Sequence, residues 1–478
     1  MSSVISDAEG APATMGIPRA AQAAVQLLLL VVAAVAALAV GALPAVGGPL
    51  AATKGIQVLS TYQVNLARTG YNPNDQITQS AAAQFRPLWT DQVPASIVDE
   101  PAVVGGVAYW GDYQGNEHAT NSQGDNLWTT NLGTTTACNS TSGVASTATV
   151  GDHGGTRMVW TGTGDGEVAA LNASTGAIIW KTRIVPPTSG FVWDSPALYR
   201  GSIYIGASSY GDCPLVRGRV VRLNALTGKI QAIFYTAPSG CLGGGVWASP
   251  AIDTATGTVF VTTGNANCDD PLQNSIVSLN AATLALVGSW QIPASDATGN
   301  SDFGATPTLF TAVLNGTTTP MVGAANKDGY FYALPRNSLS SGPVWQYRIA
   351  VGGTQPLHDE GSIVPAGFDG QNLYVAGGAT TINGQSCAGS IQTLNPADGA
   401  VEWQDCLAGD VLGAIHVIPG LVYVTAGDQV LALDAGTGAV VWSFTDPNQV
   451  AFDAGVTTWG SNLYVANPDG NLFAFQAG

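Results

Sequence analysis

Acidic and histidine side chains occur close together at two places in this 478-residue chain. His358, Asp359 and Glu360 are consecutive and could supply an acid and a base, and Asp269 with Asp270 could supply carboxylates to a cation. Consecutive side chains point in different directions, however, so exposed loops are the simpler interpretation of both groups. Neither group predicts an active site on its own.

Several motifs that would reveal a chemistry are absent from the sequence. It has no G-x-S-x-G elbow, no CxxCH haem attachment motif and no Cys/His spacing typical of zinc. The glycine-rich CLGGG at 241–245 precedes an expected strand, whereas a dinucleotide loop joins a strand to a helix. The histidines at 118, 153 and 416 have no partner nearby in the sequence, and we expect them in loops or hydrogen-bonded in the core. The net charge of −17 argues against nucleic acid as a partner.

The elements that must position any site are indicated by a repeated phrase. It reads LNASTGAIIW up to Trp180, LNPADGAVEW up to Trp403 and LDAGTGAVVW up to Trp442. Each copy is typical of a β-hairpin, with a glycine turn before a β-branched run that ends on an aromatic residue. Looser copies end at Trp128, Phe234, Trp290 and Trp345, and a first member ends at Trp89. A repeat of this kind predicts a β-propeller.

The two ends of the repeat region complete each other. No inner strands precede Trp89, and no aromatic-ended strand follows the final SNLYVANPDGNLFAFQ at 461–476. A last blade shared by both ends would close the ring and remove exposed sheet edges. The 60 glycines and 26 prolines supply turns. We therefore predict an all-β, eight-bladed β-propeller over residues 56–478.

The N-terminus is a separate region. A polar segment at 1–22 precedes an uncharged apolar run at 23–45, which is long enough to cross a bilayer as a helix, and residues 46–55 form a linker. A cleaved signal peptide and an uncleaved signal anchor remain open, and we favour the anchor. In both cases we expect an extracytoplasmic propeller, membrane-anchored or secreted.

The six cysteines fit an oxidising compartment. Residues 387 and 406 lie symmetrically about the NPADG turn, and 241 and 268 about the DTATG turn, so antiparallel pairing would bring each pair together. Elimination then pairs 138 with 213. Sequence cannot fix the connectivity, and free buried thiols are the alternative.

The LNAxTGxxxW phrase resembles the repeat of the pyrroloquinoline quinone (PQQ) dehydrogenase propellers, and YQVNLARTGYNP at 62–73 resembles their entry segment. The resemblance covers most of residues 56–478 and is closest to the polyvinyl alcohol dehydrogenases. It is specific for the fold and weak for activity, because non-enzymatic scaffolds use the same repeat.

The resemblance implies three cofactor contacts. Trp247, in GGGVWASPAIDTATGTVFVTTGN, stands where the family stacks an indole under the quinone, and Asn265 at the end of that segment matches a metal-ligand asparagine. Lys327, in NKDGYFYAL, matches the residue that contacts the quinone oxygens. Packing between blades, a turn position and a hairpin tip are the respective structural alternatives.

The catalytic and metal positions depart from the family. Asp302, in GNSDFGATPTLF, is the candidate base, but it falls on the second acidic position of that segment, and the first is Gly299. The aligned metal-ligand glutamate is Cys213, so Asp212 could replace it only through a loop or bulge. The adjacent cysteine pair of the alcohol dehydrogenases is also missing, and only Cys138 stands in that region.

Two functions follow as hypotheses. The first is an exported dehydrogenase that oxidises a small-molecule or polymeric alcohol with PQQ and calcium, and that needs an external electron acceptor because the chain has no haem motif. The alternative is a propeller without cofactor that acts as a cell-envelope scaffold or binding module. A hydrolytic or lyase propeller is a third, weaker option. If a quinone binds, the residues at 247, 265, 302 and 327 should line one axial pocket.

Overall fold

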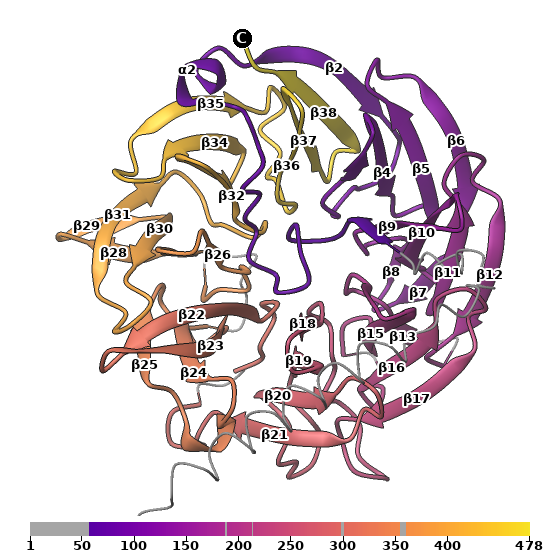
Figure 1. The fold of residues 1–478 in the computed structure, drawn as a ribbon, viewed down its shortest axis with the longest axis vertical. Helices are drawn as coiled ribbons and strands as arrows, with labels where there is room; N and C mark the ends of the chain where they lie inside the picture. Colours follow the sequence, from indigo (N-terminus) through magenta and orange to yellow (C-terminus); the bar gives the residue numbers. More distant parts are fainter. Residues whose placement is uncertain (1–56, 187–188, 213, 298–300, 354–359) are drawn as a thin grey trace, which may run out of the picture. The chain divides into compact units, whose positions relative to one another are not determined.

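The computed structural model describes residues 57–186, 189–212, 214–297, 301–353 and 360–478. These residues lie in one compact unit, Lys54–Gly478, and are almost entirely β-structure. Eight antiparallel sheets surround a common axis as the blades of a propeller (Figure 1). The predicted all-β, eight-bladed fold is therefore confirmed. The apolar run at 23–45 lies outside the described residues, and the helices in the described part of the chain are too short or too polar to span a bilayer.

The first blade combines both ends of the ring, as predicted. It contains β2 (Arg86–Gln92), β36 (Thr457–Trp459), β37 (Asn462–Asn467) and β38 (Asn471–Gln476). β2 pairs antiparallel with β38, from Arg86 opposite Gln476 to Gln92 opposite Asn471. This pairing joins the indigo and yellow ends of the chain and closes the ring (Figure 1). A closed ring leaves no long sheet edge exposed to other chains.

The next four blades follow in chain order, except that β1 (Gln57–Ser60) joins the third blade. The second contains β3 (Ala102–Val104), β4 (Val107–Gly111), β5 (Asn116–Asn121) and β6 (Asn126–Asn131). The third contains β1 (Gln57–Ser60), β9 (Thr149–His153), β10 (Thr156–Gly162), β11 (Glu167–Asn172) and β12 (Ile178–Arg183). The fourth contains β13 (Gly190–Phe191), β14 (Ala197–Tyr199), β15 (Ser202–Ser209), β16 (Arg219–Asn224) and β17 (Ile230–Tyr235). The fifth contains β18 (Ala251–Asp253), β19 (Thr258–Thr262), β20 (Ser275–Asn280) and β21 (Leu286–Gln291).

The last three blades have the same plan. The sixth contains β22 (Thr308–Leu314), β23 (Thr317–Ala325), β24 (Tyr330–Pro335) and β25 (Trp345–Arg348). The seventh contains β26 (Gly367–Phe368), β27 (Leu373–Gly377), β30 (Gly389–Leu394) and β31 (Val401–Leu407), and the eighth contains β32 (His416–Ile418), β33 (Leu421–Ala426), β34 (Gln429–Asp434) and β35 (Val440–Thr445). The additional elements are β7 (Thr135–Ala137), β8 (Ser140–Ser142), β28 (Thr380–Ile382), β29 (Gln385–Cys387), α2 (Gln79–Ala82) and the 3₁₀ turn Leu339–Ser341.

The aromatic residue of the repeated phrase joins neighbouring blades. Trp128 on the outer strand β6 donates its indole N–H to the carbonyl of Ala173 in the next blade at 2.9 Å. Its ring lies against Gly176, the glycine of the next Ser-Thr-Gly turn, which has a φ of +69° and where an added Cβ would be 2.7 Å from the indole. Trp180 contacts Gly228 in the same way. The glycine and the aromatic residue of the phrase are therefore two halves of one contact between blades.

A segment that follows β1 runs through the centre of the ring (Figure 1). Its carbonyls accept hydrogen bonds from the innermost strands of four successive blades: Leu66 from Ile252, Ala67 from Leu309, Thr69 from Phe368 and Gly70 from Val417. Arg68 in this segment is fully buried and donates to the carbonyls of Pro196 and Pro250 at 3.3 and 2.8 Å. Burial lowers the pKa of Arg68 to about 10, so it stays charged at neutral pH. The segment therefore links the blades at the axis.

The disulfide predictions are confirmed where the described residues allow a test. Cys387 bonds to Cys406 and Cys241 bonds to Cys268. Cys213 lies outside the described residues, so its predicted bond to Cys138 is not tested.

Candidate functional site

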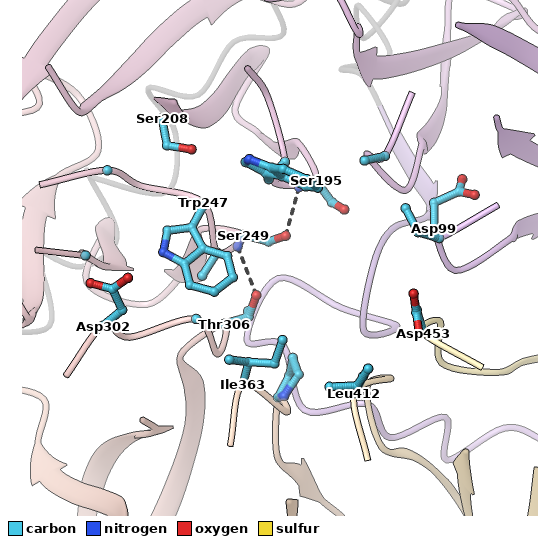
Figure 2. Close-up of a pocket in the computed structure, with 18 of the residues that line it drawn as sticks. Asp99, Ser195, Ser208, Trp247, Ser249, Asp302, Thr306, Ile363, Leu412 and Asp453 are labelled. Carbon is cyan, nitrogen blue, oxygen red and sulfur yellow. Dashed lines mark hydrogen bonds between the residues drawn. The ribbon is translucent and has the colours of Figure 1, made fainter. Parts of the chain in front are cut away.

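A cavity of about 660 Å³ lies at the axis. Every blade contributes to its wall with the residues that precede its innermost strand (Figure 2). Backbone amides and hydroxyl groups connect several of these positions around the axis: Glu100 N–H donates to Thr147 Oγ1 at 2.9 Å, Ser195 N–H to Ser249 Oγ at 2.8 Å and Ser249 N–H to Thr306 Oγ1 at 2.9 Å. These bonds hold the innermost strands at fixed distances around the cavity.

The five residues predicted for the site all line this cavity: Asp212, Trp247, Asn265, Asp302 and Lys327. Lys327 Nζ lies 3.1 Å from Asp302 Oδ2 and 5.0 Å from the centroid of the Trp247 ring. The backbone N–H of Asn265 donates to Asp302 Oδ1 at 2.5 Å. An indole, an ammonium group, a carboxylate and an amide from segments 80 residues apart in sequence (247 to 327) therefore meet on one wall.

Loops between strands of the fifth and sixth blades position these side chains. Trp247 precedes β18 and Asn265 follows β19, while Asp302 precedes β22 and Lys327 follows β23. Gly304 lies directly behind the indole, since an added Cβ would be 2.3 Å from Cη2 of Trp247. Glycine is required at this position because the indole needs that space.

Charge is distributed unequally over the cavity. Lys327 is the one Lys or Arg among the described residues that line it, whereas five carboxyl groups do so: Asp99, Glu100, Asp212, Asp302 and Asp453. Burial raises the pKa of Glu100 to about 8 and that of Asp453 to about 6, the latter with a contribution from the charge of Asp410. Burial and then the charge of Asp302 raise the pKa of Asp212, while Lys327 lowers it. Glu100 is therefore mostly neutral near pH 7, whereas Asp453 is mostly ionised.

The lining fits a planar anionic group on the Trp247 side, where the indole offers a flat surface and Lys327 a positive charge. The lining offers fewer ligands for a metal ion. Among the described residues, no group of three or more His, Cys, Asp or Glu is placed to hold an ion. Asn265, which is not one of those types, adds an amide oxygen to the carboxylates of Asp302 and Asp212. Calcium takes about 6–8 oxygen ligands, so these three side chains, with one oxygen each, would supply at most half of them.

Four residues discussed in the sequence analysis lie outside the described residues, namely Cys213, Gly299, His358 and Asp359. Glu360 is half-buried and Asp269 is exposed. Asp270 is buried and accepts a hydrogen bond from Leu272 N–H at 2.9 Å, which gives it a structural role.

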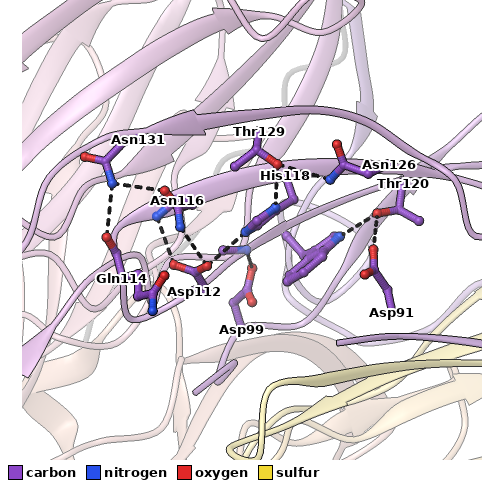
Figure 3. A network of polar contacts seen from close by, with 12 residues as sticks. Asp91, Asp99, Asp112, Gln114, Asn116, His118, Thr120, Asn126, Thr129 and Asn131 are labelled. Atoms are coloured by element: carbon purple, nitrogen blue, oxygen red, sulfur yellow. Dashed lines mark hydrogen bonds and ion pairs between the residues drawn. The ribbon is translucent and has the colours of Figure 1, made fainter. Parts of the chain in front are cut away.

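Two of the histidines, His118 and His416, are buried and have structural roles. His118 is buried, stacks on Trp110 at 4.0 Å and contacts Asp112 and Thr129 at 3.0 and 2.9 Å (Figure 3). His416 is buried against Thr458, and burial lowers its pKa to about 4. Both agree with the expectation of core histidines.

Sequence reasoning missed several parts of the wall. Trp193 and Tyr210 stack at 5.4 Å with an interplanar angle of 10°, and both line the cavity. Asp99, Glu100 and Asp453 were also missed. One signal could have located Glu100: a proline directly follows a wall residue in four blades, at 101, 196, 250 and 307.

Three comparisons place these features among known proteins. The PQQ_2 family model, described as outer membrane protein assembly factor BamB, matches residues 114–338 and 327–478. Polyvinylalcohol dehydrogenase of Sphingopyxis sp. (strain 113P3) is 27% identical over 363 residues, which cover 63% of this chain and 54% of that protein. Quinohemoprotein alcohol dehydrogenase ADH IIB of Pseudomonas putida is 30% identical over 221 residues, covering 38% of this chain and 31% of that protein.

The chain thus spans about half the length, or less, of these curated relatives. The crystal structure of quinohemoprotein alcohol dehydrogenase from Comamonas testosteroni superposes with a TM-score of 0.69 at 16% identity, covering 88% of this chain and 80% of that one. Similarity at this level of identity shows the fold alone.

Proposed function

The chain belongs to the PQQ_2 propeller-repeat family, and from this premise we propose that it is an exported quinoprotein-like dehydrogenase that oxidises an alcohol with PQQ and a divalent metal. The names of its relatives support alcohol as the substrate class. A small-molecule alcohol and a polymeric alcohol are both compatible with the proposal, and an external electron acceptor is part of it.

The observation that carries the proposal is the grouping of Lys327, Asp302 and Trp247 on one wall. Lys327 Nζ lies 3.1 Å from Asp302 Oδ2 and 5.0 Å from the centroid of the Trp247 ring. In this proposal Trp247 provides the surface on which the quinone stacks, and Lys327 binds its oxygens. Asn265 and Asp212 contribute oxygen ligands to the metal, which we propose to be calcium. The site belongs to the propeller at 56–478.

Asp302 is the proposed base. Its carboxylate accepts hydrogen bonds from Lys327 Nζ and from the backbone N–H of Asn265, which fix the position of its oxygens on the cavity wall. A carboxylate in a fixed position can accept the proton of a substrate hydroxyl as the C–H bond of the carbinol is broken. PQQ, when bound, accepts the two electrons released in that oxidation. The external acceptor then removes them from the chain.

Reconstitution with PQQ and calcium, followed by dye reduction with primary, secondary and polymeric alcohols, tests the proposal. We expect dye reduction by the wild-type protein and its loss in Asp302→Asn. Asp405→Asn is the matched control, because Asp405 is exposed on β31 and does not line the cavity. Failure of the wild-type protein to take up PQQ in this assay would refute the dehydrogenase proposal.

One observation favours the second candidate, a propeller without cofactor that acts as a cell-envelope scaffold or binding module. The excess of carboxyl groups over Lys327 in the cavity is unfavourable for a ligand that carries several negative charges. In that case the protein should bind a cell-envelope partner equally well when Lys327 is replaced by Gln. Capture of partners by wild-type and Lys327→Gln protein distinguishes the two candidates.

Export is proposed from the apolar run at 23–45, as a signal anchor or a signal peptide. Mass spectrometry of the mature N-terminus separates the two forms. A mature chain that begins within 46–53 would indicate cleavage and exclude the anchor.

A further inference from the structure

Three loops beside Trp247 are hydrogen-bonded to one another outside the blades. They are residues 216–218, 242–245 and 264–267, and together we call them the loop sheet. The middle segment contacts the first through Gly243 N–H to Val216 C=O at 3.0 Å and Gly218 N–H to Gly243 C=O at 2.9 Å. It contacts the third through the following bonds: Gly244 N–H to Asn265 C=O at 2.7 Å, Gly264 N–H to Gly245 C=O at 2.9 Å and Asn267 N–H to Leu242 C=O at 2.9 Å.

The loop sheet is tightly packed at its centre. Gly243 has a φ of +92°, and an added Cβ there would lie 2.4 Å from the carbonyl oxygen of Asn265. The Cys241–Cys268 disulfide joins the residue before the middle segment to the residue after the third segment. The bond therefore closes the loop sheet covalently at one end.

The loop sheet bears on the candidate cofactor wall directly. Trp247 follows it by two residues, and Asn265 is part of it. The backbone N–H of Asn265 also holds Asp302 Oδ1 at 2.5 Å. A shift of the middle segment against the third would therefore separate the indole from both the amide and the carboxylate. Loops held by few hydrogen bonds open more easily than the strands of a sheet.

We propose that the Cys241–Cys268 disulfide is a positioning bond: it holds the segment that carries Trp247 against the segment that carries Asn265, and so keeps the wall in the geometry that receives the quinone. This inference rests on the proposed function for the identity of the ligand. The bond's effect on the loop sheet itself does not depend on any ligand. Displacement of a catalytic constellation by about 1 Å is enough to lose much of its effect.

The chain offers a matched control in its Cys387–Cys406 disulfide. The two bonds span 27 and 19 residues, so the entropy that each removes from the unfolded chain is similar. Cys406 lies on β31 of the seventh blade and Cys387 on β29, which contacts β31, and neither lines the cavity. Loss of this bond should cost stability to a similar extent without moving the wall.

The experiment compares full-length Cys241→Ala/Cys268→Ala with Cys387→Ala/Cys406→Ala. Amide hydrogen exchange is measured at Gly244 and Gly264, together with the affinity for PQQ and the melting temperature. We expect exchange at these two amides to become at least tenfold faster, and PQQ binding at least tenfold weaker, in the first variant alone. The melting temperatures of the two variants should fall by similar amounts.

The outcomes are distinguishable. Unchanged exchange in the first variant, or the same loss of PQQ affinity in both variants, would overturn the proposal. If the wild-type protein binds no PQQ, the proposed function fails and the exchange measurement alone decides the positioning role. If the first variant does not fold, the folded Cys387→Ala/Cys406→Ala protein is treated with a thiol reductant instead, which opens the Cys241–Cys268 bond after folding. Unchanged exchange at Gly244 and Gly264 after reduction would then overturn the proposal.

Discussion

Replacement of Gly304 by alanine is the sharpest test of the Trp247 indole as a cofactor surface. The added Cβ would lie 2.3 Å from Cη2 of Trp247 and 2.6 Å from Cγ2 of Ile363. Ordinary carbon contacts are about 3.5–4.0 Å. The indole must therefore move by about 1 Å or more, since the backbone of residue 304 is held in the loop before β22. No positive φ is involved at this position, so the effect comes from the contact itself.

The magnitude follows from the cost of an added methyl group in a packed site, about 1–3 kcal/mol. If the displaced indole loses that much of its interaction with PQQ, the dissociation constant should rise by about 5-fold to 150-fold. The melting temperature should fall as well, because the same overpacking acts on the folded protein, so PQQ binding is measured well below the unfolding transition. PQQ affinity, measured by titration at fixed calcium, is the appropriate assay.

Gly288→Ala is the control for this experiment. Gly288 lies on the outer strand β21, and its added Cβ would meet only Ser278 Oγ, at an ordinary distance of 3.5 Å. It should bind PQQ as the wild-type protein does. If Gly304→Ala also binds PQQ with wild-type affinity, the indole is not the surface on which the cofactor stacks, and the assignment of Trp247 is wrong.

Three further predictions concern Asp302, Asp453 and Arg68. Asp302→Asn should lower kcat by about 10²–10⁴ while PQQ affinity stays within a few-fold, and equal losses of both would contradict a role as base. The raised pKa of Asp453 means that the folded protein binds a proton that the unfolded chain releases between about pH 4 and pH 6. The stability that this bound proton contributes is therefore full below pH 4 and is lost as the pH rises through 6. Over that range the free energy of unfolding of the wild-type protein, relative to Asp453→Asn, should fall by up to about 3 kcal/mol in denaturant titrations. A difference between the two proteins that does not vary with pH would refute this prediction. Arg68→Met should lower the free energy of unfolding by about 3–5 kcal/mol, because it leaves buried carbonyls and the nearby carboxyl groups without their cation. Arg86→Met, at an exposed position, should lower it little. Equal losses of stability in the two variants, measured by the same titrations, would contradict the role of buried Arg68.

The propeller could be predicted because the residues that join neighbouring blades belong to the repeated sequence motif. Trp128 meets Gly176, and Trp180 meets Gly228, so the glycine and the aromatic residue recur together in sequence. The shared first blade was also predictable, since Trp89 lacked inner strands that the C-terminal end possessed. Contacts within and between consecutive repeats leave a periodic trace that sequence reasoning can use.

The carboxyl-rich wall could not be predicted for the opposite reason. Asp99 and Asp453 come from blades that are adjacent in space but more than 350 residues apart in sequence (99 to 453). A blade repeat gives the order of the blades, but it does not tell which side chains turn toward the axis. Arg68 was missed similarly, because its hydrogen-bond partners lie 128 and 182 residues away along the chain.

The proposed function gives the ion pair of Lys327 with Asp302 a chemical role. The two side chains are 12% and 11% exposed, so both charges have lost most of their hydration. Such a pair contributes little net stability, and apolar residues of the same volume would often serve the fold as well. Under the proposed function both charges are used, because Lys327 holds an anionic group and Asp302 accepts a proton. The neutral state of Glu100 near pH 7 also removes part of the repulsion that would otherwise oppose an anionic ligand.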